Sequence, residues 1–110
     1  MTIQNILDAS CFTVLCTGDP NRTISKIFCC DLLSIAMSKA PADGVWVTVM
    51  GNRNTLAVAS LADVACIILA EGIHLGEAEL ACAKEEGLAV LETELPIFDA
   101  AFQLYELGNL

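Results

Sequence analysis

The sequence predicts an α/β fold: a single compact layered domain, residues 1–110, with a mainly parallel sheet and covering helices. Three runs, VWVTVM, ACIILA and LAVLE, are continuously apolar, as strands buried on both faces of a parallel sheet must be. Each run is followed by a stretch with the apolar spacing of a helix. This alternation implies right-handed crossovers, and we expect about four or five strands in all.

The N-terminal part predicts a helix and two short strands. Thr2 can cap a short helix that has one apolar face. Residues 11–16, CFTVLC, predict a strand with both faces apolar, and TGDPN at 17–21 has the composition of a turn. Residues 23–28, TISKIF, alternate weakly and predict a second short strand.

Four further helices follow. Asp31 is the expected N-cap of a helix over 32–40, which Pro41 ends. The helices after the three buried runs are expected over 54–63, 75–86 and 95–107.

The last of these helices has the clearest pattern. Ile97, Ala101 and Leu104 form one apolar stripe, and Pro96 suits the first turn. Three aromatic residues are expected to widen that stripe: Phe98, Phe102 and Tyr105.

Composition points to self-association. The chain is 55% hydrophobic and only 17% charged, against about 45–50% and about 25% in average domains. Surplus apolar surface on a small protein usually becomes an interface, so we expect a homo-oligomer, with a homodimer as the simplest form.

Charge and hydropathy argue against several other partners. Fourteen acidic residues against five basic ones give a net charge of −9, which is the wrong sign for nucleic acid or anionic lipid. The longest apolar stretch, 56–70, is shorter than the roughly 20 residues of a membrane-spanning helix. The N-terminal residues lack the basic start of a signal peptide, so we expect a cytoplasmic protein.

The six cysteines show no metal or cofactor pattern. They stand at positions 11, 16, 29, 30, 66 and 82, and no pair has the two-residue gap of zinc, iron–sulfur or thioredoxin-like motifs. We interpret them as small packed side chains and expect no metal and no cofactor. A redox role for Cys29 or Cys30 remains an alternative.

One edge of the sheet is a candidate ligand site, because open parallel sheets bind ligands at the carboxyl ends of their strands. That edge would carry GNRN at 51–54, EGIH at 71–74 and ETE at 92–94. Asn52, Arg53 and Asn54 precede a helix and so offer a cation and free N–H groups to an anion. The competing interpretation is structural: Asn54 caps the helix, Gly51 makes the turn, and Arg53 is solvated. The single histidine, His74, is expected in a solvated loop.

Residues 18–37 and the run VWVTVMGNRNTLAVASLADVACIILAEG resemble the DRTGG domain family. Such domains occur alone in bacteria and archaea, and inside larger proteins such as regulated pyrophosphatases and long phosphotransacetylases. Their fold is similar to the N-terminal, non-catalytic domain of HPr kinase/phosphorylase. Arg22 matches the arginine of the name-giving motif, Asn21 replaces its acidic residue, and the Thr-Gly-Gly step falls on 25–27, Ser-Lys-Ile.

The resemblance implies a non-catalytic regulatory or assembly module, often dimeric, serving a larger enzyme system. It carries over no catalytic residue, and it adds Arg22 to the ligand-binding candidates Asn52, Arg53 and Asn54. The alternative is a small enzyme that acts on a phosphorylated substrate at the carboxyl edge. Such an enzyme would need a base, for which only His74, Glu71 and Glu92 are at hand.

Overall fold

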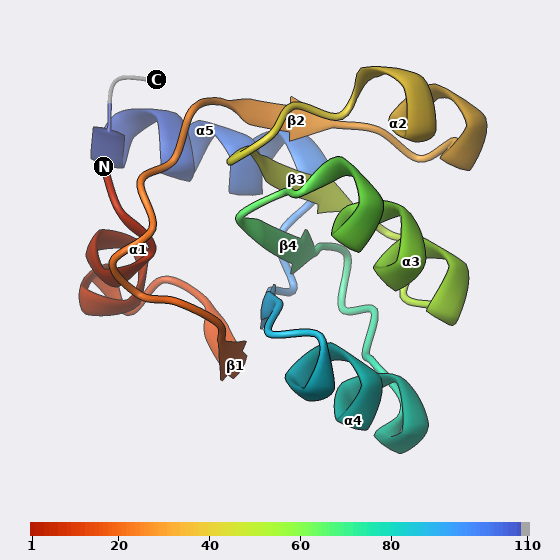
Figure 1. Ribbon diagram of the computed structural model, residues 1–110. Coiled ribbons are helices and arrows are strands. Elements are labelled where there is room, and N and C mark those ends of the chain that lie inside the picture. The colour runs from red at the N-terminus through yellow and green to blue at the C-terminus, as the bar shows by residue number, and fades with distance from the viewer. Residues whose placement is uncertain (109–110) are drawn as a thin grey trace.

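The computed structural model describes residues 1–108, which form five helices and a five-stranded sheet of order β1-β5-β4-β3-β2. The strands are β1 (Thr13–Thr17), β2 (Ile27–Cys29), β3 (Val45–Thr48), β4 (Cys66–Leu69) and β5 (Ala89–Glu92). The helices are α1 (Ile3–Ala9), α2 (Leu33–Lys39), α3 (Arg53–Ala62), α4 (Glu77–Glu85) and α5 (Ile97–Gly108). The prediction of a layered α/β domain with a mainly parallel sheet is confirmed (Figure 1).

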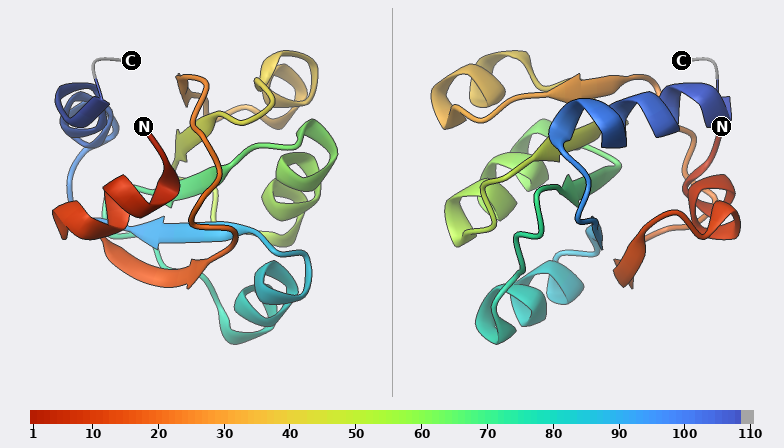
Figure 2. Two further views of the ribbon diagram at one scale, coloured as in Figure 1. Left: turned by 60° about the vertical axis from the view of Figure 1, so that its left-hand side comes forward. Right: turned by 180° about the vertical axis from the view of Figure 1, so that it is seen from behind.

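Strands β2, β3, β4 and β5 are parallel, and each step along the chain moves to the neighbouring strand. Every residue of β3, β4 and β5 is buried, which is why these strands are apolar except at the ends of β3 and β5, where Thr48 and Glu92 stand. The three crossover helices α2, α3 and α4 all pack on one face of the sheet, while α1 and α5 cover the other face (Figure 2). The parallel part of the sheet is therefore wound in a single direction.

Strand β1 departs from this plan. It pairs antiparallel with β5, at the edge of the sheet, and has an irregularity between Val14 and Cys16. A strand forms here as expected, but it is not buried on both faces, since Val14 is 43% exposed and both terminal threonines are exposed. Strand β2 is also shorter than expected, and Thr23 instead forms an isolated antiparallel bridge with Thr2.

Helix α1 begins as predicted. Thr2 is its N-cap, with a reciprocal capping box made by the Asn5 side chain. The Met1 side chain, just before α1, lies against Gly108 at the end of α5. A Cβ added to Gly108 would be 3.0 Å from the Met1 sulfur. The first helix and the last are thus held together at their outer ends.

Asp31 does not cap α2, and that prediction is wrong. The N-cap residue is Leu32, and no side chain accepts a hydrogen bond from the first turn. The Asp31 carboxylate instead accepts hydrogen bonds from Thr48 Oγ1 at 3.0 Å and from the Val49 N–H at 3.2 Å. Those donors lie where β3 ends, so Asp31 fastens the carboxyl ends of β2 and β3 together rather than starting a helix.

The aromatic residues of α5 are not part of its buried face. Ala100 and Leu104 are fully buried against the sheet, whereas Phe98, Phe102 and Tyr105 are 74%, 49% and 49% exposed. The expected widening of the apolar stripe is therefore wrong: α5 packs on β2 and β3 through a narrow stripe and leaves its aromatic flank in solvent. No helix within residues 1–108 is long and apolar enough to cross a membrane.

Candidate functional site at the carboxyl edge of the sheet

Arg22 lies at the amino-terminal edge of the parallel strands. Its Nε is 2.8 Å from Asp43 Oδ1, and its Nη2 is 2.9 Å from Asp63 Oδ1 and also donates to the Asp63 carbonyl. Asp43 precedes β3 and Asp63 precedes β4, so the guanidinium bridges the two segments that enter neighbouring strands. Arg22 is therefore at the opposite end of the strands from residues 52–54, and the structure does not bring the four candidate residues together.

The contacts of Arg22 are structural. Asp43 and Asp63 both have left-handed backbone conformations, with φ of 62° and 59°, and Asp63 ends α3. Burial by itself lowers the pKa of the Arg22 guanidinium, but its hydrogen bonds and proximity to the two aspartates raise the pKa overall. The side chain is only 25% exposed, and its Nε and Nη2 donors are taken up by Asp43 and Asp63.

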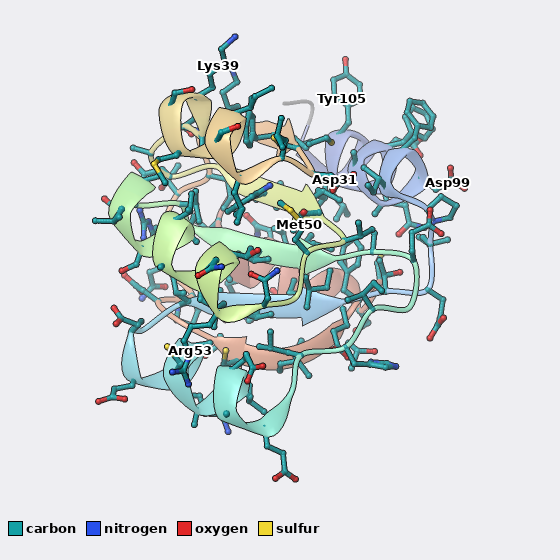
Figure 3. All side chains as sticks on the ribbon, turned by 90° about the vertical axis from the view of Figure 1, so that its right-hand side faces the viewer. Asp31, Lys39, Met50, Arg53, Asp99 and Tyr105 are labelled. Atoms are coloured by element: carbon teal, nitrogen blue, oxygen red, sulfur yellow. The ribbon has the colours of Figure 1, made fainter. Side chains whose placement is uncertain are left out.

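Asn52 is the N-cap of α3. Its Oδ1 accepts from the Thr55 N–H at 3.0 Å, and Thr55 Oγ1 lies 3.3 Å away. The alternative role of Asn54 as the cap is thus wrong, because the helix begins at Arg53, earlier than its apolar pattern. Arg53 and Asn54 are exposed on the first turn, and Arg53 forms no ion pair with any residue of the 1–108 range (Figure 3). They remain open to a ligand.

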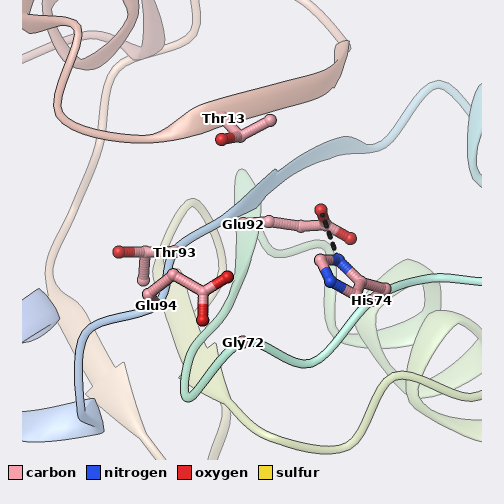
Figure 4. Close-up of a pocket in the computed structure, with 6 residues that line it drawn as sticks. All are labelled: Thr13, Gly72, His74, Glu92, Thr93 and Glu94. Atoms are coloured by element: carbon pink, nitrogen blue, oxygen red, sulfur yellow. Dashed lines mark hydrogen bonds and ion pairs between the residues drawn. The ribbon is translucent and has the colours of Figure 1, made fainter.

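A histidine–carboxylate pair stands at the same edge of the sheet. Glu92, the last residue of β5, is 8% exposed, and its Oε1 lies 3.1 Å from His74 Nδ1 (Figure 4). Glu92 Oε2 accepts from the Leu75 N–H at 3.0 Å. The side chain of His74 is 72% exposed, so it is solvated as expected. The buried Glu92 carboxylate nevertheless fixes the orientation of its ring.

A small hollow of about 50 Å³ adjoins this pair. Its walls come from the start of β1, the end of β5 and the loops after β4 and β5, and they consist of Thr13, Gly72, His74, Glu92, Thr93 and Glu94 (Figure 4). Gly51 lies close by, since a Cβ there would be 3.2 Å from Ile73 Cγ2 and 3.4 Å from the His74 carbonyl. The GNRN loop and the His74 segment are thus neighbours, as expected for loops at one edge.

The sequence placed His74 and Glu92 at this edge but did not pair them. Thr13 was missed entirely, because it reaches the hollow only through the antiparallel pairing of β1 with β5. Glu71, the third possible base, has a left-handed backbone, with φ of 60°, and does not line the hollow. Among residues 1–108, no three His, Cys, Asp or Glu side chains converge to hold a metal ion.

The topology explains why this edge is shallow. Deep crevices in open α/β sheets form where the strand order reverses and adjacent connections leave on opposite faces. Here α2, α3 and α4 share one face and the strands follow one another in order, so no such reversal occurs in the parallel part. The carboxyl edge therefore has loops and a hollow in place of a deep cleft.

The family model for the DRTGG domain matches residues 2–107. The chain belongs to the DRTGG domain family. The match spans the helix α1, the antiparallel strand and the final helix as well as the parallel core, so the whole described domain is the DRTGG unit. A search of curated proteins gave no match. In this DRTGG domain Arg22 bridges the segments that enter β3 and β4.

The six cysteines of the DRTGG domain differ in exposure, and Cys16, Cys30 and Cys82 are partly buried. Cys66 is buried, whereas Cys11 and Cys29 are exposed, so the packing interpretation is wrong for those two. Burial raises the pKa of Cys66 well above its usual value and also raises that of Cys16. The side chain of Cys29 reaches the surface, but partial desolvation and then the nearby Asp31 raise the pKa of its thiol.

We expect the thiols to label in a matching order. At pH 7.5, a maleimide should modify the exposed Cys11 first, the exposed Cys29 more slowly because its raised pKa lowers the thiolate fraction, and Cys66 only after unfolding because burial blocks access. Mass spectrometry of peptides from timed samples would give the order, with labelling in urea as the reference. Fast modification of Cys66 in the native protein would contradict the packing described above.

Proposed function

We propose that this DRTGG domain is a non-catalytic regulatory or assembly module that works as a homo-oligomer in the cytoplasm and serves a larger enzyme system. The observation that supports this most directly is membership in the DRTGG family across residues 2–107. The exposed aromatic flank of α5 supports self-association, since such surface is costly to leave in water. The acidic balance disfavours nucleic acid as a partner.

We further propose that the module senses a small anionic or nucleotide ligand at the start of α3. The first turn carries unpaired N–H groups and the positive end of the helix dipole, roughly half a charge. Arg53 adds a full positive charge there and is exposed, in a chain with few cations. Asn52 holds the turn in place through its bond to Thr55.

A titration tests this site. Nucleotides or acetyl phosphate should bind weakly, in the millimolar to high micromolar range, about 4 to 6 kcal/mol. Arg53→Ala should weaken binding by about 10- to 100-fold, because a charge-assisted hydrogen bond contributes about 1.5–3 kcal/mol. Calorimetry or NMR shifts of the amides at 52–55 would follow the effect.

Two variants serve as controls. Lys84→Ala removes an exposed cation from α4 and should leave the affinity unchanged. Arg22→Ala should also leave it unchanged while lowering stability, because Arg22 is held by Asp43 and Asp63. Binding that depends on Arg22 and ignores Arg53 would move the ligand to the opposite edge of the sheet.

The second candidate function is a small enzyme acting on a phosphorylated substrate, and the His74–Glu92 pair favours it. A carboxylate that orients an exposed histidine is an arrangement used for general base catalysis. If this function holds, His74→Gln should abolish turnover of a phosphorylated substrate, and Glu92→Gln should reduce it and shift its pH profile. If the domain is instead a regulatory module, His74→Gln and Glu92→Gln should change only the local stability of this edge, and neither the wild type nor the variants should turn over the substrate.

A further inference from the structure

The β4–α4 loop, residues 70–76, lies at the carboxyl edge of the sheet and takes part in both features found there. Gly72 and His74 line the hollow, and the first residues of the loop are held by backbone hydrogen bonds to the segment after β5. The later residues are held by the Glu92 carboxylate: its Oε1 lies 3.1 Å from His74 Nδ1, and its Oε2 accepts from the Leu75 N–H at 3.0 Å. Glu92 therefore fixes the loop to the end of β5.

The same loop contacts the residue that precedes the N-cap of α3. A Cβ added to Gly51 would lie 3.2 Å from Ile73 Cγ2 and 3.4 Å from the His74 carbonyl oxygen, so the two loops are in direct contact. Gly51 is followed by Asn52, the N-cap, and then by Arg53. A displacement of the β4–α4 loop at Ile73 would therefore displace the turn that leads into α3.

These contacts join three elements that lie far apart along the chain. Glu92 at the end of β5 holds the β4–α4 loop, the loop packs on Gly51 through Ile73, and Gly51 leads into α3. Strands β4 and β5 are buried at every position, so they give the loop a rigid base. Contiguous packed contacts of this kind are one means by which two sites influence each other.

We propose that the β4–α4 loop couples the His74–Glu92 pair to the anion site at the start of α3. The inference rests on the proposed ligand site and names how its occupancy reaches a second place on the surface. While Glu92 fixes the loop, the turn before α3 is held in place, and an ordered turn loses less freedom when an anion binds. Coupling between two sites is reciprocal, so an anion bound at α3 restrains His74 to the same degree.

Glu92 is a positioning residue in this arrangement. It is buried, and both of its carboxylate oxygens contact the β4–α4 loop, so it does not touch the anion itself. A loss of local stability at this edge, as expected for Glu92→Gln, would reach the anion through the loop. His74 has the opposite character, since its side chain is mostly exposed. The order of the loop is thereby displayed on the surface, where another protein can contact it.

The transfer of one methyl group between Gly51 and Ile73 tests the contact. Gly51→Ala adds a Cβ that presses on Ile73 Cγ2, and Gly51 lies outside the left-handed region, so the backbone itself tolerates alanine. Ile73→Ala removes that Cγ2 and leaves a gap, and the variant should fold because Ile73 is 37% exposed. The double variant places the new methyl group beside the vacated space and restores the contact.

Titrations with AMP and with acetyl phosphate measure the coupling. The chain has a single histidine, so its ring signals in NMR spectra report on the His74–Glu92 pair, and they should shift when the anion binds to the wild type. Each single variant should weaken binding by about 5-fold or more and reduce the His74 response, and the double variant should restore both. Leu61→Ala is the matched control, because it truncates an apolar side chain of α3 that is 82% exposed, and it should change neither.

The outcomes separate this inference from the ligand site on which it rests. If neither anion binds the wild type, the ligand site is wrong and the coupling is wrong with it. If an anion binds through Arg53 and Ile73→Ala leaves its affinity unchanged, the coupling alone is overturned. The coupling is also overturned if the His74 response persists in Ile73→Ala, since the anion then contacts the histidine directly, or if the double variant fails to repair the single losses.

Discussion

Replacing Trp46 with alanine should lower the free energy of unfolding by about 3–5 kcal/mol. Trp46 lies on β3, between β4 and the edge strand β2, and is fully buried. Its ring packs against Phe28 with centres 6.4 Å apart, and its Nε1 donates to the Cys30 carbonyl at 2.9 Å. Removing it leaves a cavity beneath α2 and α3 and an unpaired carbonyl beside β2. Domains of this size have about 5–15 kcal/mol of stability in all, so the loss is a large share of it.

Urea denaturation followed by far-UV circular dichroism would measure the effect, since Trp46 is the sole tryptophan and its fluorescence disappears with it. Trp46→Phe keeps an aromatic ring but loses the donor to Cys30, and should cost about 1–3 kcal/mol. Met37→Ala alters a side chain that is 64% exposed, and should stay within about 0.5 kcal/mol of the wild type. A Trp46→Ala variant as stable as Met37→Ala would show that this core is not packed as described.

Gly18→Ala should be the most damaging single-methyl change in the loops. Gly18 has φ of 56°, and a Cβ there would lie 2.9 Å from both Ala89 N and the Gly87 carbonyl. Both neighbours are backbone atoms, so the clash cannot be relieved by a side-chain rotation. We expect a loss of about 2–4 kcal/mol, from the left-handed backbone and from displacement of β1 against β5.

Gly87→Ala is the matched control. Gly87 has a similar φ of 71°, but nothing lies within 4 Å of an added Cβ, so only the backbone cost of about 1–2 kcal/mol applies. Denaturant titrations give both values, and hydrogen exchange of the β1 amides should accelerate in Gly18→Ala alone. Equal losses in the two variants would mean that the approach of Gly18 to β5 is looser than the geometry indicates.

The parallel core was predictable because a strand that is buried on both faces has apolar residues at successive positions. Strands β3, β4 and β5 are fully buried, and their short runs rich in Val and Ile are typical of strands in a parallel sheet. Strand β1 gives a weaker signal, since its partner β5 is more than 70 residues away in sequence and nothing local sets its direction. For the same reason Thr13 could not be assigned to the carboxyl edge.

Helix α5 shows a different limit. Apolar spacing identifies a helix, but it does not say which of two apolar flanks meets the sheet. In this domain the small Ala100 faces the sheet and the aromatic residues face the solvent. When a helix has more apolar residues than its contact with the sheet can cover, hydrophobicity alone does not show which of them are buried.

The candidate site was predictable at the level of loops and not of contacts. The sequence brings GNRN and EGIH to one edge, and Gly51 does pack against Ile73 and His74. It could not show that Asn52, two residues before Asn54, accepts from Thr55, nor that Arg22 is taken up by Asp43 and Asp63. Both contacts depend on which polar group lies nearest in the folded domain, and the spacing of residues along the chain does not reveal this.

The contact between Met1 and Gly108 has a consequence for how the domain can be connected. Since the two positions touch, a host polypeptide could leave one surface loop, pass through the whole domain and return to that loop almost where it left. Such an insertion would impose little strain on either partner. The same closeness permits the two positions to be joined by a short linker and new ends to be opened elsewhere, for example in the exposed turn at 19–21. The domain can therefore be inserted into another protein without a change in the packing of its core.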